Sequence, residues 1–576
     1  MAVEAAGGVV TWTRPSNVEM FWSQLRHASR AFWRTPIAAF FTIVFPLIFL
    51  LLIGALAGNQ VIDQRSGVRL AQFLTPAIAA FASVSATFTA LAIGLVIDRE
   101  AGILKRARGT PLPPWLFMAA RVGSSVWIAL VSVALMLLIG VVLFDVQLIA
   151  RTAPAALLTL TIGIGCFAAL GLAVVAVSPS QSATQAITNV IIIPMAFVSD
   201  VFAIGGDPPR WLQIVGWTFP LKHFTNALGD TFNPFLDGAQ FGWYHLAVMA
   251  AWGILGTVIA LRFFSWEPHP ESSRRNPGAH EDDAAASAVT LRSPEHGSRP
   301  GVGSLIGTQV RYTNRAFVRH TASAFFIVVF PVLLLLMVPV VFGNQPLASR
   351  GGIQLTQFMA PVLAVFGAAT AAYSDFSERV AFARDRGVLK RIHGTPLPVW
   401  AFVAGRIGSA ICVAFASLLI TVAVGMVVYG VQIVPRALPG LFVSVSLGIA
   451  CFAALGLAVA AVAPNADTVP TITNATLLPL AFFSDIFVIA DNMPRWMEII
   501  GWIFPLKHFA NAVADGMNPT VAGAGFFGAH LAVMAAWLVA GLFVALRFWT
   551  WEPRARADHG HRRRRRSAAQ ETPSIP

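Results

Sequence analysis

Twelve long apolar runs divide this sequence, and they constrain its fold more than any other feature. Each run is close to the roughly 20 residues that an α-helix needs to cross the hydrocarbon of a bilayer. The runs are continuous and do not alternate, so they do not fit the strands of a membrane β-barrel. The sequence therefore predicts an all-α polytopic membrane protein with twelve transmembrane helices, at residues 37–57, 73–96, 116–144, 153–177, 186–204, 245–264, 322–342, 358–378, 401–429, 438–462, 471–490 and 530–549.

The composition supports an integral membrane protein. Charged residues make up 12% of the chain and hydrophobic residues 56%, with a mean hydropathy of +0.70. A soluble protein carries roughly 25% charged residues, so a soluble enzyme and a disordered chain are both excluded. The net charge of +13 suggests nucleic acid, but the basic residues lie between apolar runs, as the positive-inside rule predicts. We therefore expect contact with membrane lipid and no nucleic-acid partner.

The twelve runs form two sets of six that repeat at an offset of 285 residues. The segment GTPLP at 109–113 returns at 394–398, and FPLKHF at 219–224 returns at 504–509. Such a repeat indicates duplication and fusion. We expect a cytoplasmic N-terminus with an interfacial helix at 1–35, a first half at 36–268, a flexible linker at 269–303, a second half at 304–553 and a basic disordered tail at 554–576.

The positions of Lys and Arg predict the orientation. Basic residues precede the first run, fill the loop between the second and third runs, and follow each sixth run. By the positive-inside rule both termini, the linker and the loop at 98–115 should be cytoplasmic.

The loop at 98–115 carries the most specific motif. It reads DREAGILKRARGTPLPPW, and its copy at 383–400 reads ARDRGVLKRIHGTPLPVW. This pattern resembles the segment between spans two and three of the ABC-2 family of ATP-binding-cassette export permeases. In that family the segment is the coupling helix that docks on the ATPase subunit; a merely topogenic basic loop is the alternative. The resemblance implies coupling roles for Glu100, Lys105, Arg106, Gly109, Thr110, Pro111, Asp385, Lys390, Arg391, Gly394, Thr395 and Pro396.

The resemblance also implies an architecture and partners. It predicts two six-helix repeats of the type V exporter kind, related by a pseudo-two-fold axis, with two copies of a separate ATPase chain. No GxxxxGK[ST] segment occurs in the chain, so nucleotide phosphates have no P-loop here. We therefore expect a permease subunit that is not itself an enzyme and holds no cofactor, with ATP and Mg²⁺ on the partner.

An amphipathic segment precedes the first run of each half. Residues 17–34 place aromatic and apolar side chains at helical spacing among basic ones, and residues 309–320 are the counterpart. The spacing predicts a helix in the membrane interface. The resemblance implies a connecting helix that also touches the ATPase; a plain membrane anchor is the alternative.

A third motif follows the fifth run, at 194–228 and again at 479–513. Gly and Pro break it into pieces too short and too polar to cross alone, which predicts two short re-entrant helices on the outer side. The segment resembles the ABC-2 signature except that Asp stands where Gly is usual. Ion pairs that fasten the short helices to the fifth span, or a role at an outer gate, are both open for Asp200, Lys222, His223, Asp485, Lys507 and His508. No other ligands cluster with the histidines and none of the three cysteines has CxxC spacing, so we expect no metal site.

The second half carries charges that the first half lacks. Asp375, Glu378 and Arg379 replace apolar residues near the cytoplasmic end of its second span. Asp375 and Arg379 have the favourable i,i+4 spacing for an ion pair. The helix could extend into the cytosol with these charges solvated, or they could attract a cationic substrate.

Family resemblance places spans two and five along the translocation path. The aromatic candidates for path or gate are Phe81, Phe88, Phe197, Phe202, Phe366, Tyr373, Phe482, Phe483 and Phe487, although simple packing is the alternative for each. Such a path suits hydrophobic or amphipathic cargo, so we expect export of antibiotics, drugs or lipids (multidrug efflux) across a bacterial plasma membrane. A proton- or sodium-coupled secondary transporter and a non-transporting scaffold remain as alternatives.

Overall fold

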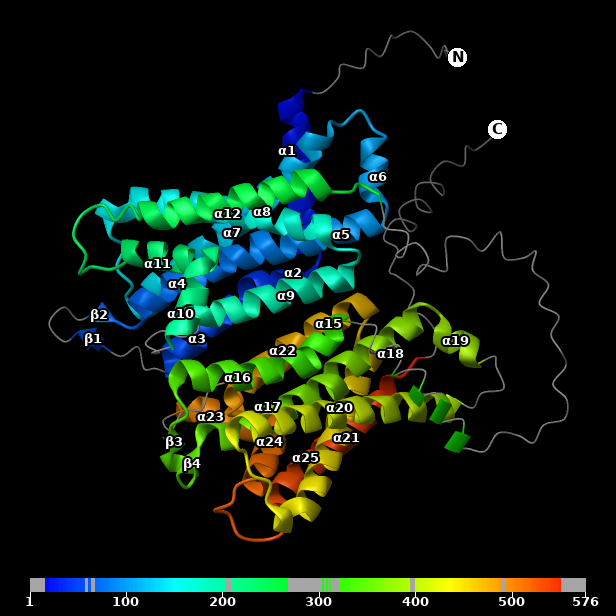
Figure 1. Cartoon of the computed structure of the whole chain (residues 1–576). Helices are drawn as coiled ribbons and strands as arrows, with labels where there is room; N and C mark the ends of the chain where they lie inside the picture. The colour runs from blue at the N-terminus through cyan, green and yellow to red at the C-terminus, as the bar shows by residue number, and fades with distance from the viewer. Residues whose placement is uncertain are drawn as a thin grey trace, which may run out of the picture. The chain divides into compact units, whose positions relative to one another are not determined.

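The computed structural model is almost entirely helical and separates into two compact units, one built from the first half of the chain and one from the second (Figure 1). It describes residues 16–56, 61–63, 68–201, 209–267, 321–393, 399–487 and 493–550, with single residues and pairs between 303 and 314. Most of the linker and the whole basic tail lie outside the described residues, as does most of the second amphipathic segment at 309–320.

Helices cover all six apolar runs of the first half. In order they are α2–η1–α3 (Pro36–Ala39, Phe40–Val44, Phe45–Leu56), α4–η2–α5 (Ala71–Val84, Ser85–Ala90, Leu91–Glu100), α7 (Pro114–Phe144), α8 (Ala153–Val177, after η3 at Ala150–Thr152), α9 (Gln181–Val198) and α12 (Trp243–Phe263).

The second unit repeats this order. Its helices are α15–η5–α16 (Thr321–Ala324, Phe325–Val329, Phe330–Phe342), α17–η7–α18 (Leu355–Ala369, Thr370–Asp375, Phe376–Asp385), α20 (Val399–Tyr429), α21 (Leu438–Val462, after η8 at Pro435–Ala437), α22 (Val469–Phe483, after η9 at Ala466–Thr468) and α25 (Gly528–Phe548). Among the described residues ten helices are long and apolar enough to cross a membrane, and the shorter apolar helices Phe40–Ala55 and Val469–Phe483 occupy the other two runs. The predicted all-α polytopic fold is confirmed.

The fifth run of each half ends earlier than its apolar length predicts. Helix α9 stops at Val198 and α22 at Phe483, whereas the apolar runs continue to 204 and 490. The cause is local: Asp200 and Asp485 have φ of +60° and +59°. A residue in the left-handed region cannot continue a right-handed helix, so the turn follows at once.

A π-helical segment lies in the middle of the second span of each unit, at η2 and η7. The backbone of this segment packs directly against a glycine of the fourth span. A Cβ at Gly171 would lie 2.8 Å from the carbonyl oxygen of Thr87, and one at Gly456 would lie 2.7 Å from that of Tyr373. Only glycine lets the two helices approach this closely.

Shorter elements close the two ends of each unit. Unit 1 has α1 (Asn17–Trp33), α6 (Ile103–Arg108), α10 (Arg210–Thr218), α11 (Pro220–Thr231) and the paired strands β1 (Val61–Asp63) and β2 (Val68–Arg69). Unit 2 has the paired strands β3 (Pro346–Leu347) and β4 (Ile353–Gln354), then η6 (Ala348–Arg350), α19 (Val388–His393), α23 (Arg495–Ile503) and α24 (Pro505–Gly516). The helix predicted at 17–34 and the two short helices after the fifth span are confirmed as helices. The two small hairpins were not predicted, since each strand has only two or three residues.

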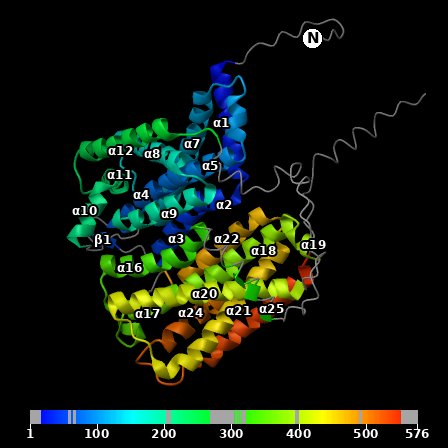
Figure 2. The ribbon, with the colours of Figure 1, turned by 45° about the vertical axis from the view of Figure 1, so that its right-hand side comes forward.

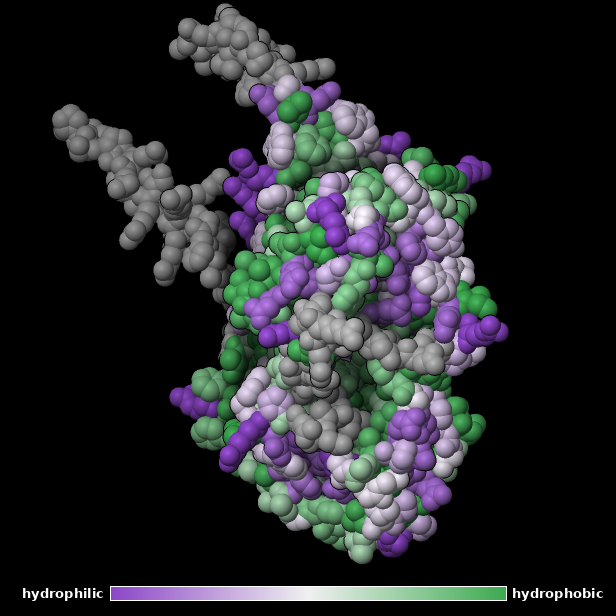
Figure 3. Space-filling view, turned by 90° about the vertical axis from the view of Figure 1, so that its left-hand side faces the viewer, coloured by the Kyte–Doolittle hydropathy of each residue, from purple (hydrophilic) through white to green (hydrophobic). Residues whose placement is uncertain are grey.

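The loop helix and the short helix pair lie at opposite ends of the long helices, as Figure 1 shows for α6 and α10–α11 and Figure 2 for α19 and α24. Gln72, at the start of α4, donates from Nε2 to the carbonyl of Phe232, just after α11, at 2.7 Å; Gln357 repeats this bond with Met517 at 2.7 Å. The span α4–η2–α5 has 30 residues and is therefore about 45 Å long. Hydrophilic side chains are scattered over the face on which α10 and α11 lie (Figure 3), as expected for an end that leaves the hydrocarbon.

Candidate functional site

The predicted coupling loop forms a small exposed helix on a buried anchor. Gly102, at φ +67°, turns the chain from α5 into α6. Leu104 is fully buried, while Lys105 and Arg106 are exposed. The loop therefore presents a basic surface, and no ion pair within the described part of unit 1 involves Lys105 or Arg106.

The end of this helix is held by its own polar groups. Thr110 Oγ1 donates to the carbonyl of Ala107 at 2.7 Å, and Gly109, Thr110 and Pro111 are exposed. In unit 2, Gly387 at φ +68° immediately precedes α19, and Lys390 is exposed. Gly394, Thr395 and Pro396 lie outside the described residues, as does the side chain of Arg391.

A buried arginine just before each loop ties it to the fourth span, and the sequence analysis missed it. Arg99 is fully buried and donates from Nη1 to the carbonyl of Val175 at 2.9 Å and from Nη2 to that of Ser178. Arg384 does the same with Ala460 at 2.7 Å and Ala463 at 3.1 Å. These carbonyls end α8 and α21, where helix acceptors have no partner within the helix. The sequence did contain a signal for this residue: an arginine directly before the acid recurs at the repeat offset, as Arg99-Glu100 and Arg384-Asp385.

The acids predicted to couple also engage their own unit. Glu100 Oε1 accepts from the backbone N–H of Gln181 at 2.8 Å, at the start of α9. Asp385 Oδ2 accepts from the N–H of Ala466 at 2.6 Å, ahead of α22. The Arg–acid pair therefore joins the coupling loop to the junction of the fourth and fifth spans; docking on an ATPase stays a prediction for these acids.

The two units place charge differently near this end. Asp98 pairs with Arg121 in unit 1, but Ala383 stands at the position equivalent to Asp98. The equivalent of Arg121 is Arg406, which donates to the carbonyl of Arg379 at 3.2 Å.

The i,i+4 pair predicted in unit 2 is confirmed. Asp375 Oδ2 lies 2.9 Å from Arg379 Nε, with side chains only 13% and 21% exposed. These two charges are therefore not solvated in a protruding helix. Attraction of a cationic substrate by these residues stays a prediction.

The outer ion pairs predicted from the third motif are confirmed. Lys222 Nζ lies 3.1 Å from Asp200 Oδ2, and Lys507 Nζ lies 3.5 Å from Asp485 Oδ1. Both lysines are buried and lie over a tryptophan ring, Trp217 or Trp502. Asp is compatible with the left-handed turn at these two positions, because it tolerates this region better than most residues, and it supplies the counter-ion of a buried lysine.

In unit 2 the outer ion pair includes an arginine that the sequence analysis did not identify; its equivalent in the first half, Arg65, lies outside the described residues. Arg350 Nη2 lies 3.1 Å from Asp485 Oδ2, and Arg350 Nη1 lies 3.6 Å from Asp515 Oδ1. Burial raises the pKa of Asp515, while Arg350 acts in the opposite direction. Arg350 lies in the β3–β4 hairpin, so only the tertiary fold brings it to the ion pair.

Each outer cluster also contains a pair of histidines. His223 Nδ1 lies 2.9 Å from His245 Nδ1, and His508 Nδ1 lies 2.9 Å from His530 Nδ1. His223 Nε2 and His508 Nε2 each lie 2.8 Å from a tryptophan carbonyl, to which they must donate. The predicted histidines therefore fasten α11 to α12 and α24 to α25. Among the described residues no group of three or more His, Cys, Asp or Glu side chains could hold a metal.

Most of the predicted path aromatics pack inside their own units. Phe81, Phe88, Phe366, Tyr373 and Phe482 are buried. Phe88 lies against Phe167, Phe366 against Phe487, Phe483 against Trp496, and the Tyr373 hydroxyl is 2.8 Å from Thr476 Oγ1. Phe197, Phe483 and Phe487 are partly exposed, and Phe202 lies outside the described residues. A role in a path stays a prediction.

Comparison with known proteins gives two matches to one family model, described as ABC-2 type transporter, at residues 19–232 and 305–518. The probable multidrug ABC transporter permease YbhR of Escherichia coli (strain K12) is 24% identical over 132 residues, 23% of this chain and 36% of that protein. The daunorubicin resistance ABC transporter permease protein DrrB1 of Streptomyces coeruleorubidus is 39% identical over 90 residues, 16% of this chain and 29% of that protein. The chain thus spans about a third of the length of these relatives. The two family matches cover both halves, and this chain belongs to the ABC-2 type transporter family as a tandem repeat.

Proposed function

We propose that this chain is the transmembrane subunit of an ATP-driven exporter for hydrophobic or amphipathic compounds such as antibiotics, drugs or lipids. Two copies of a separate ATPase chain would bind the loops at 98–115 and 383–400 and carry ATP and Mg²⁺. The two halves would be related by a pseudo-two-fold axis, with both termini cytoplasmic, in a bacterial plasma membrane. The names of the relatives, multidrug and daunorubicin resistance permeases, support the choice of cargo.

The observation that carries this proposal is the joint between the exposed basic loop and the buried arginine behind it. Lys105 and Arg106 are available to an acidic partner surface. Arg99 and Glu100 hold the same loop to the ends of α8 and α9 by three hydrogen bonds. A push on the loop is therefore passed to the fourth and fifth spans without a flexible link, which is the mechanical requirement for a coupling element.

The test is charge reversal of Lys105 and Arg106 together with Lys390 and Arg391. The variant is co-expressed with candidate ATPase chains from the host, purified, and assayed for drug-stimulated ATP hydrolysis and for transport into inverted vesicles. We expect it to fold, since Lys105, Arg106 and Lys390 are exposed, and to lose both co-purification and stimulation. Reversal of Arg210 and Arg495, basic residues that begin the short helix pair at the opposite end of each unit, is the control and should leave both intact.

Normal stimulated hydrolysis by the loop variant would remove the coupling role. Transport that needs no ATPase partner and follows a proton or sodium gradient would replace the proposed function by that of a secondary transporter.

A further inference from the structure

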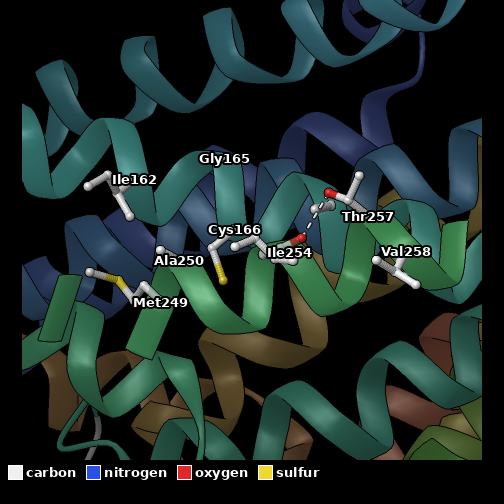
Figure 4. A pocket seen from close by; sticks show the side chains of 10 residues that line it. Ile162, Gly165, Cys166, Met249, Ala250, Ile254, Thr257 and Val258 are labelled. Atoms are coloured by element: carbon white, nitrogen blue, oxygen red, sulfur yellow. Dashed lines mark hydrogen bonds between the residues drawn. The ribbon is translucent and has the colours of Figure 1, made fainter. Parts of the chain in front are cut away.

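An apolar groove runs along the outside of unit 1 between α8 and α12. Its volume is about 330 Å³, at the lower end of the roughly 300–1,000 Å³ of small-molecule sites. Figure 4 shows Gly165 and Cys166 on one wall and Ile254 and Val258 on the other. Gly165, Ile254 and Val258 are exposed, so the groove opens to the surface of a membrane-spanning helix pair.

The groove arises from small side chains in its lining and not from a separation of the helices, because α8 and α12 are in close contact. A Cβ on Gly256 of α12 would lie 2.9 Å from the backbone of Ala169. A Cβ on the equivalent Gly541 would lie 3.0 Å from the backbone of Ala454. The helix pair is therefore equally tight in both units. What differs is the lining.

The second half carries larger residues where the first half has the groove. Gly165 is replaced by Ala450, Gly253 by Leu538, and Thr257 by Leu542. The duplicated half thus provides a natural version of the same helix pair with the space filled. It also shows that this backbone accepts the larger side chains.

The groove suits an alkyl chain and little else. Its lining is apolar apart from a thiol and one hydroxyl, and Thr257 Oγ1 already donates to the carbonyl of Gly253 at 2.8 Å (Figure 4). The hydroxyl proton is thus used within the helix, and the thiol is only a weak donor, so the lining offers a polar ligand little. Acyl chains are also the molecules present at high concentration against this face of the protein.

A positive charge marks one end of the groove. Arg262 is exposed and follows Val258 by four residues, so the two side chains lie on the same face of α12, one turn apart. A basic residue at the end of a span attracts anionic headgroups. We propose that this groove binds one acyl chain of an anionic phospholipid whose phosphate lies at Arg262.

The test is photocrosslinking in the full chain. The protein is reconstituted into phosphatidylcholine vesicles that contain a trace of phosphatidylglycerol with a diazirine in one acyl chain, irradiated and mapped by peptide mass spectrometry. We expect the label to concentrate on peptides 162–169 and 249–258 over the equivalent peptides 447–454 and 534–543. A phosphatidylcholine probe with the same chain should label the groove about fivefold less, the factor expected from one basic residue at a charged surface.

Four variants sharpen the result. G165A with G253L copies the second half and should lower groove labelling to the level of peptides 447–454 and 534–543. R262Q should abolish the difference between the two headgroups. L261V changes an exposed residue of α12 that does not line the groove and should change nothing. In the reverse direction, A450G with L538G should move label to the second unit, a gain that misfolding cannot produce.

Even labelling of all lipid-facing helices in the wild-type chain would overturn the proposal, since the groove would then hold only passing lipid. Equal labelling by both headgroups would overturn the anionic assignment. A groove that stays unlabelled, because protein covers it, would overturn the proposal as well.

Discussion

Replacing Asp485 by alanine should lower the free energy of unfolding in two ways: through the lost ion pair and through backbone strain. The carboxylate is the counter-ion of Lys507, which is buried, and also binds Arg350 at 3.1 Å and Asn511 at 3.3 Å. The backbone at this position has φ +59°, which Asp and Asn tolerate and Ala does not. The structure allows the two contributions to be estimated and separated.

The expected loss is large because the site is closed. Asp485 is only 10% exposed, and removing one partner of a buried ion pair costs about 3–5 kcal/mol. The left-handed backbone adds about 1–2 kcal/mol for Ala and nothing for Gly. D485A should therefore lose about 4–7 kcal/mol, and D485G the ion-pair part alone. Asp200, 39% exposed, is reached by water, so the pair part of D200A should be at most about 1 kcal/mol.

The assay is thermal unfolding of the purified chain in detergent, followed by tryptophan fluorescence and by loss of the monodisperse peak. At about 2–4 °C per kcal/mol for a unit of this size, D485A should lower the apparent Tm by at least about 8 °C and D200A by about half as much. K507M added to D485N should restore part of the loss, because the uncompensated lysine is then gone.

Equal melting of D485A and D485G would refute the backbone part of this reasoning. Failure of K507M to restore any stability would refute the ion-pair part. An equal loss in D200A and D485A would show that exposure of the carboxylate does not set the cost.

Three further predictions concern unit 1. R99M should leave the carbonyls at the end of α8 without their donor, at a cost of about 1–3 kcal/mol for each buried acceptor. It should lower both the apparent Tm and the ATPase stimulation, whereas a destabilising change away from the loop should lower the apparent Tm alone. G171A should destabilise by about 1–3 kcal/mol, since its Cβ meets the carbonyl oxygen of Thr87; G165A, whose Cβ meets nothing within 4 Å, is the matched control and should melt as wild type. Burial raises the pKa of Asp230 above its ordinary 3.8, so its contribution to stability is present below that value and is lost as pH rises through the raised pKa. D230N should therefore raise the apparent Tm at pH 7, and the gain should vanish as the pH falls towards 3.8.

The sequence predicted the elements that follow from the hydropathy of a segment and from residues that recur at the repeat offset. Twelve apolar runs had to become helices because a bilayer offers no partner for backbone groups. The outer ion pair was predictable because Asp200 and Lys222 recur together at the repeat offset in Asp485 and Lys507. The end of α9 was predicted six residues too late, because hydropathy does not register that Asp200 adopts a left-handed backbone.

The elements that the sequence did not predict depend on which carbonyl or side chain lies across from a given residue. Arg99 looks like one more cytoplasmic positive charge, yet it is buried on the end of α8. His245 looks like a polar start to α12, yet it pairs with His223. Both residues recur at the repeat offset, so comparison of the halves could have identified them as candidates without giving their partners.

The duplication itself separates framework from specialisation. Features that both halves keep are mechanical: the buried arginine at the coupling loop, the glutamine between the second span and the short helices, the histidine pair and the glycine under the π-helical segment. Features that differ are chemical: the transposed acids near Arg379 and the filled groove at Leu538. After a gene duplication the shared set is what any half needs in order to fold and to respond to its loop. The unshared set is where the two halves can take different ligands, so the exchange of single residues between them, with each half as the control for the other, is the most direct way to assign those ligands.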